Sequence, residues 1–554
     1  MPKVRLRLLA TTIAVGLSSA LAIHFARAQH TGIDTYAITN ARVVPVSGAI
    51  IERGTVVIRN GLIAAVGANV NPPADARIID GAGLTVYPGL IDSYTNLALP
   101  EASPSPSPPA GGGGGFFLQQ QTTPRAAGPN STQPAGLQPE TMVEDIIRTG
   151  GSDVENARNV GFTSALTLPR TGIWIGQSAL INLSGETPQQ MIVRSPVAMH
   201  VGFTPLRGGY PGSLMGVFAT LRQMMLDAQR YRDSMKIYES SARGIRRPET
   251  DRSLESLVPV IEGKMPVVML ANTEREITRA LDLASEFKLK LIIAGGRESG
   301  RLTDRLLKQD VPVLLSLNLP RRTTAAIPEA EPEPLRVLRE RVEAQQTAGK
   351  LAKAKVHFAF QSGSLPNASD IMVNANRTIE NGLSTEDALR AFTIWPAEIL
   401  GVANQLGSIE VGKIANLTIT RGDLFDRNSR ITHVFIDGRP VDLRPAQSSG
   451  QGSGRNLNGA WTLSINLGEE KTVSLNLRQE GDRLSGSIQG SLGSAEISNA
   501  SVSNDVRFTV VLNLGGETKE ANFVGTLSGN EIRGSVTMEG RAPGTFTATR
   551  NVPN

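Results

Sequence analysis

The stretch VYPGLIDSYTNLALP, residues 86–100, marks the point where one kind of structure gives way to another. A Pro-Gly turn is followed by an apolar pair and Asp92, a pattern typical of a buried strand that ends beside a pocket. Tyr94 and Asn96 stand next along the same strand. This stretch therefore predicts both a domain boundary and the location of a site.

Strand-rich segments flank a long central region. Residues 55–67, TVVIRNGLIAAVG, place two apolar runs around Asn60-Gly61, a pair that favours a tight hairpin turn. Residues 407–441 carry further strand patterns, with Asp437-Gly438 as a turn. We expect residues 29–89 and 403–445 to form the two parts of one split β-sandwich.

Residues 90–402 alternate between strand and helix patterns. Between 266 and 296, an apolar strand precedes Thr273 and Glu276, which have the spacing of a capping box. One face of the helix that follows is apolar and comprises Ile277, Ala280, Leu281, Ala284 and Phe287. Because such strand–helix–strand units recur, the sequence predicts the α/β class and a TIM (β/α)8-like barrel.

Two details refine this central region. Ser384 and Asp387 are expected to cap a helix within residues 384–402, where Pro396 suits a first helical turn and Gly401 suits a stop. Residues 101–139 are dominated by Pro, Gly, Ser and Gln without an apolar period, which favours a disordered insertion in the barrel.

The C-terminal part has a different pattern. Residues 446–457 form a Gly/Ser-rich linker. Residues 458–552 then alternate apolar and polar positions around close turns such as Gly481-Asp482 and Gly529-Asn530. About eight short strands with this spacing predict a separate antiparallel β domain, either a barrel or a sandwich.

The N-terminus is typical of an export signal. Three basic residues precede an apolar run over 8–23, and Ala26-Arg27-Ala28 resembles a cleavage site. We expect residues 1–28 to be removed after Ala28, giving a periplasmic or cell-envelope protein; an uncleaved membrane anchor is the alternative. Loss of the segment's four basic residues lowers the formal net charge from +5 to +1, so a nucleic-acid partner is not indicated. The chain has no cysteine, which excludes disulfides and thiolate chemistry.

The order of these parts resembles the amidohydrolase superfamily. The phrases YPGLID (87–92) and LSTEDALRAFTIWPAEILGVANQLGSIEVGKIANLTI (383–419) carry the resemblance, which covers about residues 36–441. The exported imidazolonepropionase-like and prolidase-like members are the most similar. The resemblance implies a TIM barrel with a mono- or binuclear metal site at the C-terminal strand ends. There, metal-activated water would hydrolyse amide-like or ester bonds.

The metal ligands that this resemblance implies are missing from their expected positions. The first strand would end in His-x-His, but Tyr94 and Asn96 stand there. Two later strands would each supply a His. Leu270 and Asn272 occupy the likely positions in one of them, and Gly295 or its neighbour stands in the other. The last strand would supply an Asp, but Ser362 and Gly363 are found. Because aliphatic side chains and glycine cannot bind zinc, we interpret these positions as a degenerate metal site and predict no metal and no cofactor.

Few other residues could carry chemistry. Asp92 is a weak candidate for a general base, although bonding to neighbouring backbone groups is the favoured interpretation. His200 is a weak candidate for the barrel mouth, and packing is favoured over a metal role. His357 and His433 are expected near the far strand end and on the sandwich surface.

Two main functional hypotheses follow. The first is a non-catalytic envelope protein that binds an unidentified small molecule in the old pocket, or pairs with an active amidohydrolase-like paralogue or with itself. The second is a hydrolase of non-peptide carbon–nitrogen bonds with an atypical or metal-free site, or with zinc if the ligands are present after all. A third, carbohydrate or lipid binding led by the C-terminal β domain, also stays open.

Overall fold

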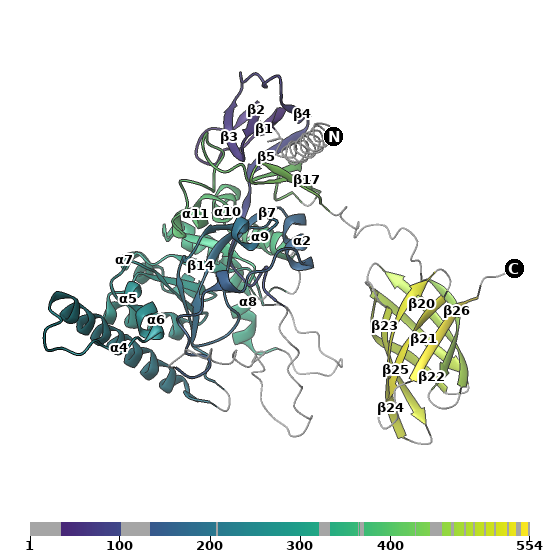
Figure 1. Cartoon of the computed structure of the whole chain (residues 1–554). Helices are drawn as coiled ribbons and strands as arrows, with labels where there is room; N and C mark the ends of the chain where they lie inside the picture. The colour runs from purple at the N-terminus through teal and green to yellow at the C-terminus, as the bar shows by residue number, and fades with distance from the viewer. Residues whose placement is uncertain are drawn as a thin grey trace, which may run out of the picture. The chain divides into compact units, whose positions relative to one another are not determined.

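The structure is a computed structural model (Figure 1). It describes residues 35–100, 133–206, 209–320, 333–363, 365, 370–426, 428–443 and 457–551, the last range without 467–469, 481–482, 491–492, 503–505, 515–516, 529–530 and 539–543. The predicted signal segment 1–28, most of the insertion 101–139 and nearly all of the linker 446–457 lie outside these residues. The chain divides into two compact units, residues 1–443 and 444–554.

Strands from both ends of the first unit share one eight-stranded sheet, in which β16 pairs antiparallel with β5. The strands are β1 (Tyr36–Val43), β2 (Ile51–Arg59), β3 (Leu62–Gly67), β4 (Arg77–Asp80), β5 (Leu84–Pro88), β16 (Leu417–Arg421), β17 (Arg430–Ile436) and β18 (Arg439–Val441). Both predicted hairpin turns are present: Asn60-Gly61 joins β2 to β3 and Asp437-Gly438 joins β17 to β18, all with positive φ. Hydrogen bonds thus connect the two predicted sandwich parts into a single sheet.

The α/β part of this unit contains two further sheets. One has the order β10-β9-β7-β6, and the other has the order β15-β14-β13-β12-β11-β8. Their strands are β6 (Leu90–Thr95), β7 (Phe162–Thr167), β8 (Trp174–Gln177), β9 (Ala179–Asn182), β10 (Ile192–Arg194), β11 (Met199–Gly202), β12 (Val267–Ala271), β13 (Leu291–Gly295), β14 (Val313–Ser316) and β15 (Phe358–Gln361). The run from β11 to β15 is parallel, as predicted, and so is the pair β6–β7. The pairings of β8, β9 and β10 are antiparallel, so an uninterrupted parallel ring of eight strands is not confirmed.

Helices connect and cover these strands. They are η1 (Val143–Asp145), α2 (Ser152–Asn159), α3 (Pro188–Met191), α4 (Leu214–Ser240), α5 (Arg252–Ile261), α6 (Glu274–Phe287), η2 (Ser299–Arg301), α7 (Thr303–Lys308), α8 (Leu335–Lys353), α9 (Asp370–Glu380), α10 (Thr385–Phe392) and α11 (Ile394–Ile399). The capping box at Thr273 and Glu276 is confirmed, and the predicted apolar face of α6 is buried. In the part of the chain that is described, no helix has the length and apolar character to cross a membrane.

The single helix expected within 384–402 is wrong in one respect. Ser384 caps its start as predicted, with its side chain accepting a hydrogen bond from the Asp387 amide. The helix then breaks at Thr393 into α10 and α11. Pro396 explains the break, because proline has no N–H to donate to the carbonyl four residues earlier.

The second unit is a closed barrel of eight antiparallel strands, which confirms the predicted antiparallel β domain. Its strands are β19 (Gly459–Asn466), β20 (Glu470–Glu480), β21 (Arg483–Gly490), β22 (Gly493–Val502), β23 (Val506–Leu514), β24 (Glu517–Ser528), β25 (Glu531–Met538) and β26 (Gly544–Arg550), and β26 closes onto β19. Apolar side chains form its core; among them, Phe508 and Phe523 stack with ring centroids 4.7 Å apart. An eight-stranded barrel is just wide enough for side chains to fill its interior.

Candidate functional site

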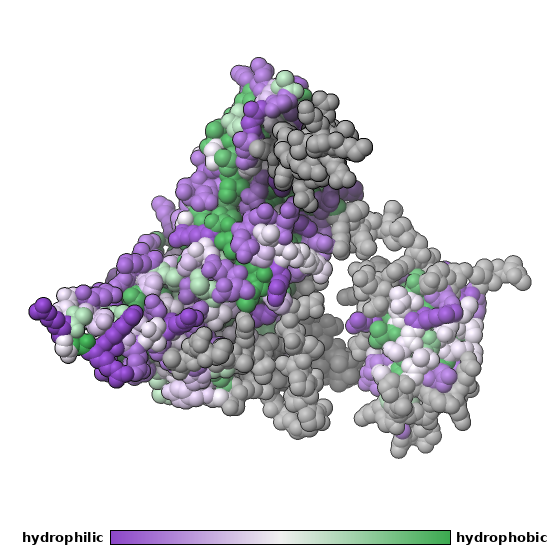
Figure 2. All heavy atoms as spheres, in the orientation of Figure 1, coloured by the Kyte–Doolittle hydropathy of each residue, from purple (hydrophilic) through white to green (hydrophobic). Residues whose placement is uncertain are grey.

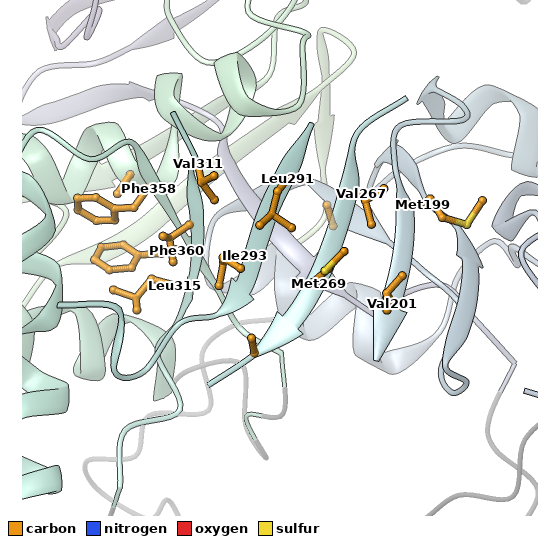
Figure 3. Packing of buried hydrophobic residues seen from close by; sticks show 14 of the residues in the cluster. Met199, Val201, Val267, Met269, Leu291, Ile293, Val311, Leu315, Phe358 and Phe360 are labelled. Atoms are coloured by element: carbon orange, nitrogen blue, oxygen red, sulfur yellow. The ribbon is translucent and has the colours of Figure 1, made fainter. Parts of the chain in front are cut away.

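The strands β11 to β15 sort their side chains onto two faces. Figure 3 shows the side chains of one face, including Val267, Met269 and Ile293, which pack in the same cluster as the helices. The alternate residues form a second cluster, here called the interior cluster, with residues of β6, β7 and β9. It comprises Ile91, Leu166, Leu180, Val197, Ala198, Val268, Ile292, Ala294, Leu314, Ala359, Ala397, Leu400, Val402 and Leu406. Because side chains alternate along a strand, this interior cluster lies on the opposite face of the strands from the residues shown in Figure 3.

His200 lies on this interior face. It pairs in register with Val268 of the interior cluster, while its neighbours Met199 and Val201 face the helices. The side chain is fully buried, and neither ring nitrogen has a hydrogen-bond partner in the described structure. Burial lowers the pKa of His200 to about 3. The imidazole is therefore neutral near pH 7, with one N–H to donate and one nitrogen to accept.

Tyr94 lies beside His200, with ring centroids 5.6 Å apart. It is half-buried and packs against the interior cluster. Burial raises the pKa of its hydroxyl, which therefore stays protonated and can donate a hydrogen bond. Tyr94 thus brings a polar group to the interior face at a position where the resemblance implied a histidine.

Asp92 joins two strands that are not paired by a backbone ladder. Its Oδ1 accepts hydrogen bonds from the backbone N–H of Ser362, at 3.0 Å, and of Tyr94, at 3.5 Å. Next to it, Ser93 Oγ donates to the Phe360 carbonyl at 2.7 Å. The carboxyl group is 1% exposed, and this burial raises its pKa to about 6 although the hydrogen bonds from Ser362 oppose the shift. The Asp92 carboxyl group thus links β6 by a hydrogen bond to the residue that follows β15.

Gln361 is a site residue that the sequence reasoning missed. It is 2% exposed and lies on the same strand face as Ala359; its Nε2 donates to the Leu314 carbonyl at 3.4 Å, whereas its Oε1 has no described partner. A Cβ at Gly363 would lie 2.3 Å from this oxygen and 3.2 Å from the Tyr94 ring, so the three residues are neighbours. The signal was available: in the strand FAFQ, a polar residue takes an interior position that alternation assigns to the core.

Leu270, Asn272 and Gly295 lie together at the ends of β12 and β13. Leu270 packs against the interior cluster, and Asn272 follows β12, with its N–H donating to the carboxylate of Glu276. Gly295 has φ +90°, and a Cβ there would lie 2.4 Å from Asn272 Oδ1. Because this backbone conformation is strained for any L side chain, the local structure does not accept a histidine at residue 295.

The other predicted positions are not part of this group. Asn96 turns away to donate to the Leu168 carbonyl at 2.8 Å. His357 is largely exposed, with Nε2 3.8 Å from Glu398. His433 lies half-buried in β17, and its Nδ1 is 3.2 Å from the Thr432 hydroxyl.

The residues at the strand ends do not fit the metal centre that the resemblance implies. Such a centre needs several imidazoles and carboxylates to converge. Within the described ranges, no group of three or more His, Asp or Glu side chains is placed to hold a metal ion. On the interior face, one imidazole, His200, is accompanied by Tyr94, Leu270 and Gln361, and the carboxylate of Asp92 is bonded to backbone amides.

A second group of buried polar residues joins the α/β part to the eight-stranded sheet. Asn416 Nδ2 donates to Ser164 Oγ, at 3.0 Å, and to Asn182 Oδ1, at 2.8 Å. Asn182 in turn donates to the Asp437 carboxylate at 2.7 Å, and the Asp437 N–H donates to Asn416 Oδ1 at 2.8 Å. We call Ser164, Asn182, Asn416 and Asp437 the asparagine network. Sequence reasoning missed it because its hydrogen-bonded members are up to 255 residues apart in the chain.

A cavity of about 480 Å³ lies elsewhere on the first unit, between α9 and the segment that leads into β17. Its lining includes Met372, Arg377, Leu424 and Ile431. None of the predicted site residues lines it.

Known proteins resemble parts of this chain. Residues 323–441 match the amidohydrolase family. A 63-residue stretch is 36% identical to a dihydroorotase from Pelobacter propionicus, but it spans only 11% of this chain and 15% of that enzyme. The crystal structure of an amidohydrolase from Thermotoga maritima MSB8 aligns with a TM-score of 0.62 and 25% identity, covering 74% of this chain and 100% of its own. The alignment with the crystal structure of a prolidase complexed with N-methylphosphonate-L-proline also covers 74% of this chain and 100% of that one, with a TM-score of 0.43 and 17% identity.

Proposed function

Because the chain belongs to the amidohydrolase superfamily, we propose that it has kept the fold, lost metal-dependent hydrolysis and now binds a small molecule at the interior face. The observation that carries this proposal is the local structure at Leu270 and Gly295. Leu270 is part of an apolar packing, and Gly295 has a backbone that a histidine could adopt only with strain. Leu270 and Gly295, which stand where the resemblance implies metal ligands, therefore serve packing and backbone geometry instead.

The polar groups that remain suggest the character of the ligand. His200 is neutral and offers one donor and one acceptor, and Gln361 offers an acceptor. Buried polar groups in native proteins nearly always have a partner, either protein, water or ligand. The Asp92 carboxylate is already bonded to backbone amides, so a charged ligand would lose its hydration here without a free counter-group, which is costly. We therefore expect a small, uncharged ligand with several hydrogen-bonding groups.

Metal analysis tests the first half of this proposal. Protein purified without chelators should contain well below one zinc, manganese or iron per chain, measured by inductively coupled plasma mass spectrometry. A stoichiometric, tightly bound metal would show that ligands converge after all. Binding is tested by thermal shift with a panel of uncharged amides and polyols. A hit should lose its effect in His200→Leu and keep it in Asn404→Ala, an exposed position.

A second candidate function rests on Asp92. A buried carboxyl group with a pKa of about 6 is typical of general acid–base sites, and that of Asp92 accepts a hydrogen bond from the Tyr94 backbone N–H. The protein would then hydrolyse non-peptide carbon–nitrogen bonds without the usual metal centre. Turnover of cyclic amides or dipeptides that persists in chelator and disappears in Asp92→Asn would favour this function. Absence of turnover at every pH between 5 and 8 would argue against it.

We also propose two features that accompany this role. The protein is exported and cleaved after Ala28, so mass spectrometry of the purified mature chain should find Gln29 at its N-terminus. The α/β strands complete a (β/α)8-type barrel, in which the Asp92 and Ser93 hydrogen bonds to the end of β15 substitute for a backbone ladder. A crystal structure of the mature protein would test both the closure and the ligand.

A further inference from the structure

The cavity of about 480 Å³ beside α9 lies where the eight-stranded sheet meets the α/β part (Figure 1). None of the residues of the interior face lines it. One wall is a single face of α9, formed by Met372, Val373, Asn376, Arg377 and Glu380. The other lining residues are Val160, Leu424, Asp426, Ser429 and Ile431. A volume of this size is within the range of sites that bind small molecules.

Half of the lining residues are apolar. Leu424 is buried, whereas Val373 is 53% exposed, so the apolar surface runs from the core out to solvent. Hydrophobic residues also reach the visible surface of this unit elsewhere (Figure 2), so an apolar lining alone does not identify a site. The polar groups of the lining are therefore the more informative ones.

Arg377 and Asp426 line the cavity without pairing with each other. Arg377 Nη1 donates to Asn374 Oδ1 at 3.1 Å, and its guanidinium forms no ion pair with a described residue. Asp426 Oδ1 accepts a hydrogen bond from the Asn428 N–H at 3.4 Å, and this carboxylate has no ion pair among the described residues either. Glu380, the third charged residue of the lining, already interacts with another residue of the chain. The cavity thus offers a ligand one exposed cation and one exposed anion.

Ser429 adds a buried hydroxyl group to the lining. Its N–H donates to the Asp426 carbonyl at 3.0 Å, which places the two residues in one turn. Its Oγ is inaccessible to solvent and has no hydrogen-bond partner in the described part of the chain. Because buried polar groups in native proteins nearly always have a partner, this hydroxyl indicates a hydrogen bond to a bound molecule or to water.

We propose that this cavity binds a free α-amino acid with an aliphatic side chain. Arg377 holds the carboxylate of the ligand through paired N–H groups, and Asp426 binds its ammonium group. The apolar wall covers the aliphatic side chain. Because Arg377 and Asp426 are exposed, the charged groups of the ligand keep part of their hydration, unlike those of a charged ligand at the interior face. This site is independent of the function proposed for the interior face.

Isothermal titration calorimetry of the full-length chain with L-leucine tests the class of ligand. Two analogues each lack one charge: 4-methylpentanoate has no ammonium group, and 3-methylbutylamine has no carboxylate. L-Leucine should bind, and both analogues and glycine should bind at least about tenfold more weakly. Equal binding of 4-methylpentanoate would overturn the zwitterionic ligand. If L-leucine, L-valine and L-methionine all fail to bind at millimolar concentrations, the site itself is overturned.

Variants test the location of the site. Arg377→Met and Asp426→Asn should each weaken L-leucine binding at least about tenfold, with unchanged thermal melting because both residues are exposed. Ser429→Ala should weaken it about threefold, since a neutral hydrogen bond is weaker. Arg230→Met, at an exposed position of α4 outside the lining, is the matched control and should leave the affinity unchanged.

His200→Leu should also leave the affinity for L-leucine unchanged, which separates this site from the interior face. If L-leucine binding survives in both Arg377→Met and Asp426→Asn, the proposed location is wrong. If it is lost in His200→Leu and kept in Arg377→Met, the amino acid binds at the interior face instead.

Discussion

Two groups of buried polar residues in the first unit differ in how far their hydrogen bonds are satisfied. In the asparagine network, Asn416 uses both ends of its amide, and Asn182 bonds to the Asp437 carboxylate. On the interior face, both ring nitrogens of His200 and the Gln361 Oε1 have no hydrogen-bond partner among the described residues. Since unsatisfied buried groups are costly, the network is typical of a structural joint and the interior face of a binding site.

The largest expected effect comes from breaking the network. Asn416→Leu removes three hydrogen bonds and leaves the Asp437 N–H and Asn182 Oδ1 with fewer partners. We expect a loss of about 3 kcal/mol in the free energy of unfolding of the first unit. This free energy is measured by urea denaturation followed by tryptophan fluorescence. A Trp461→Phe background removes the fluorescence signal of the C-terminal barrel.

Asn404→Ala is the matched control for this change. Asn404 is exposed and outside the network, so its loss should alter stability by less than about 0.5 kcal/mol. Equal effects of the two substitutions would remove the distinction between a satisfied joint and an ordinary surface asparagine.

The second prediction concerns Asp92, whose pKa is raised by burial to about 6. The folded chain therefore holds this proton more tightly than the unfolded chain. The stability gained from this tighter proton binding is fully present below about pH 4 and is lost as the pH rises through 6. Asp92→Asn keeps an acceptor for Ser362 and avoids the buried charge. It should therefore stabilise the first unit by about 2 kcal/mol at pH 7.5.

Parallel urea titrations at pH 4 and pH 7.5 measure this difference. The gain from Asp92→Asn should disappear at the lower pH, where the wild-type carboxyl group is also neutral. A gain that is independent of pH would mean that charge is not its cause.

The smallest effect at neutral pH is expected for His200. Replacing it by Leu removes two unpartnered buried nitrogens, so stability at pH 7.5 should be unchanged or higher by about 1 kcal/mol. The depressed pKa of His200, about 3, means that the wild type loses stability as the pH falls below about 6.5. The advantage of His200→Leu should therefore grow between pH 7.5 and pH 5, opposite in direction to that of Asp92→Asn.

Denaturation of His200→Leu across this pH range provides the measurement. If the substitution costs as much as Asn416→Leu, then His200 has structural partners, and the contrast between the two groups fails. If His200→Leu leaves stability unchanged and also removes ligand binding, the contrast between the asparagine network and the interior face is strengthened.

Local patterns in the sequence predicted much of the fold. The turns at Asn60-Gly61 and Asp437-Gly438, the capping box at Thr273 and the antiparallel C-terminal domain depend on neighbouring residues, and all are present. The antiparallel course of β8, β9 and β10 was missed, because strand direction within a sheet is set by distant pairings. The break at Thr393 was not predicted, but Pro396 was expected in a first helical turn and lies in the first turn of α11.

By itself, the sequence determined the chemistry available at the strand ends, because residue types alone exclude Leu270 and Gly295 as metal ligands. Only the tertiary structure decided which polar groups are satisfied. Asn182 finds Asp437 across 255 positions, whereas His200 finds no partner among the described residues. The physical reason is that a buried group takes its hydrogen bonds from whatever the folded chain brings beside it. That neighbour is fixed by packing between distant segments and not by local sequence.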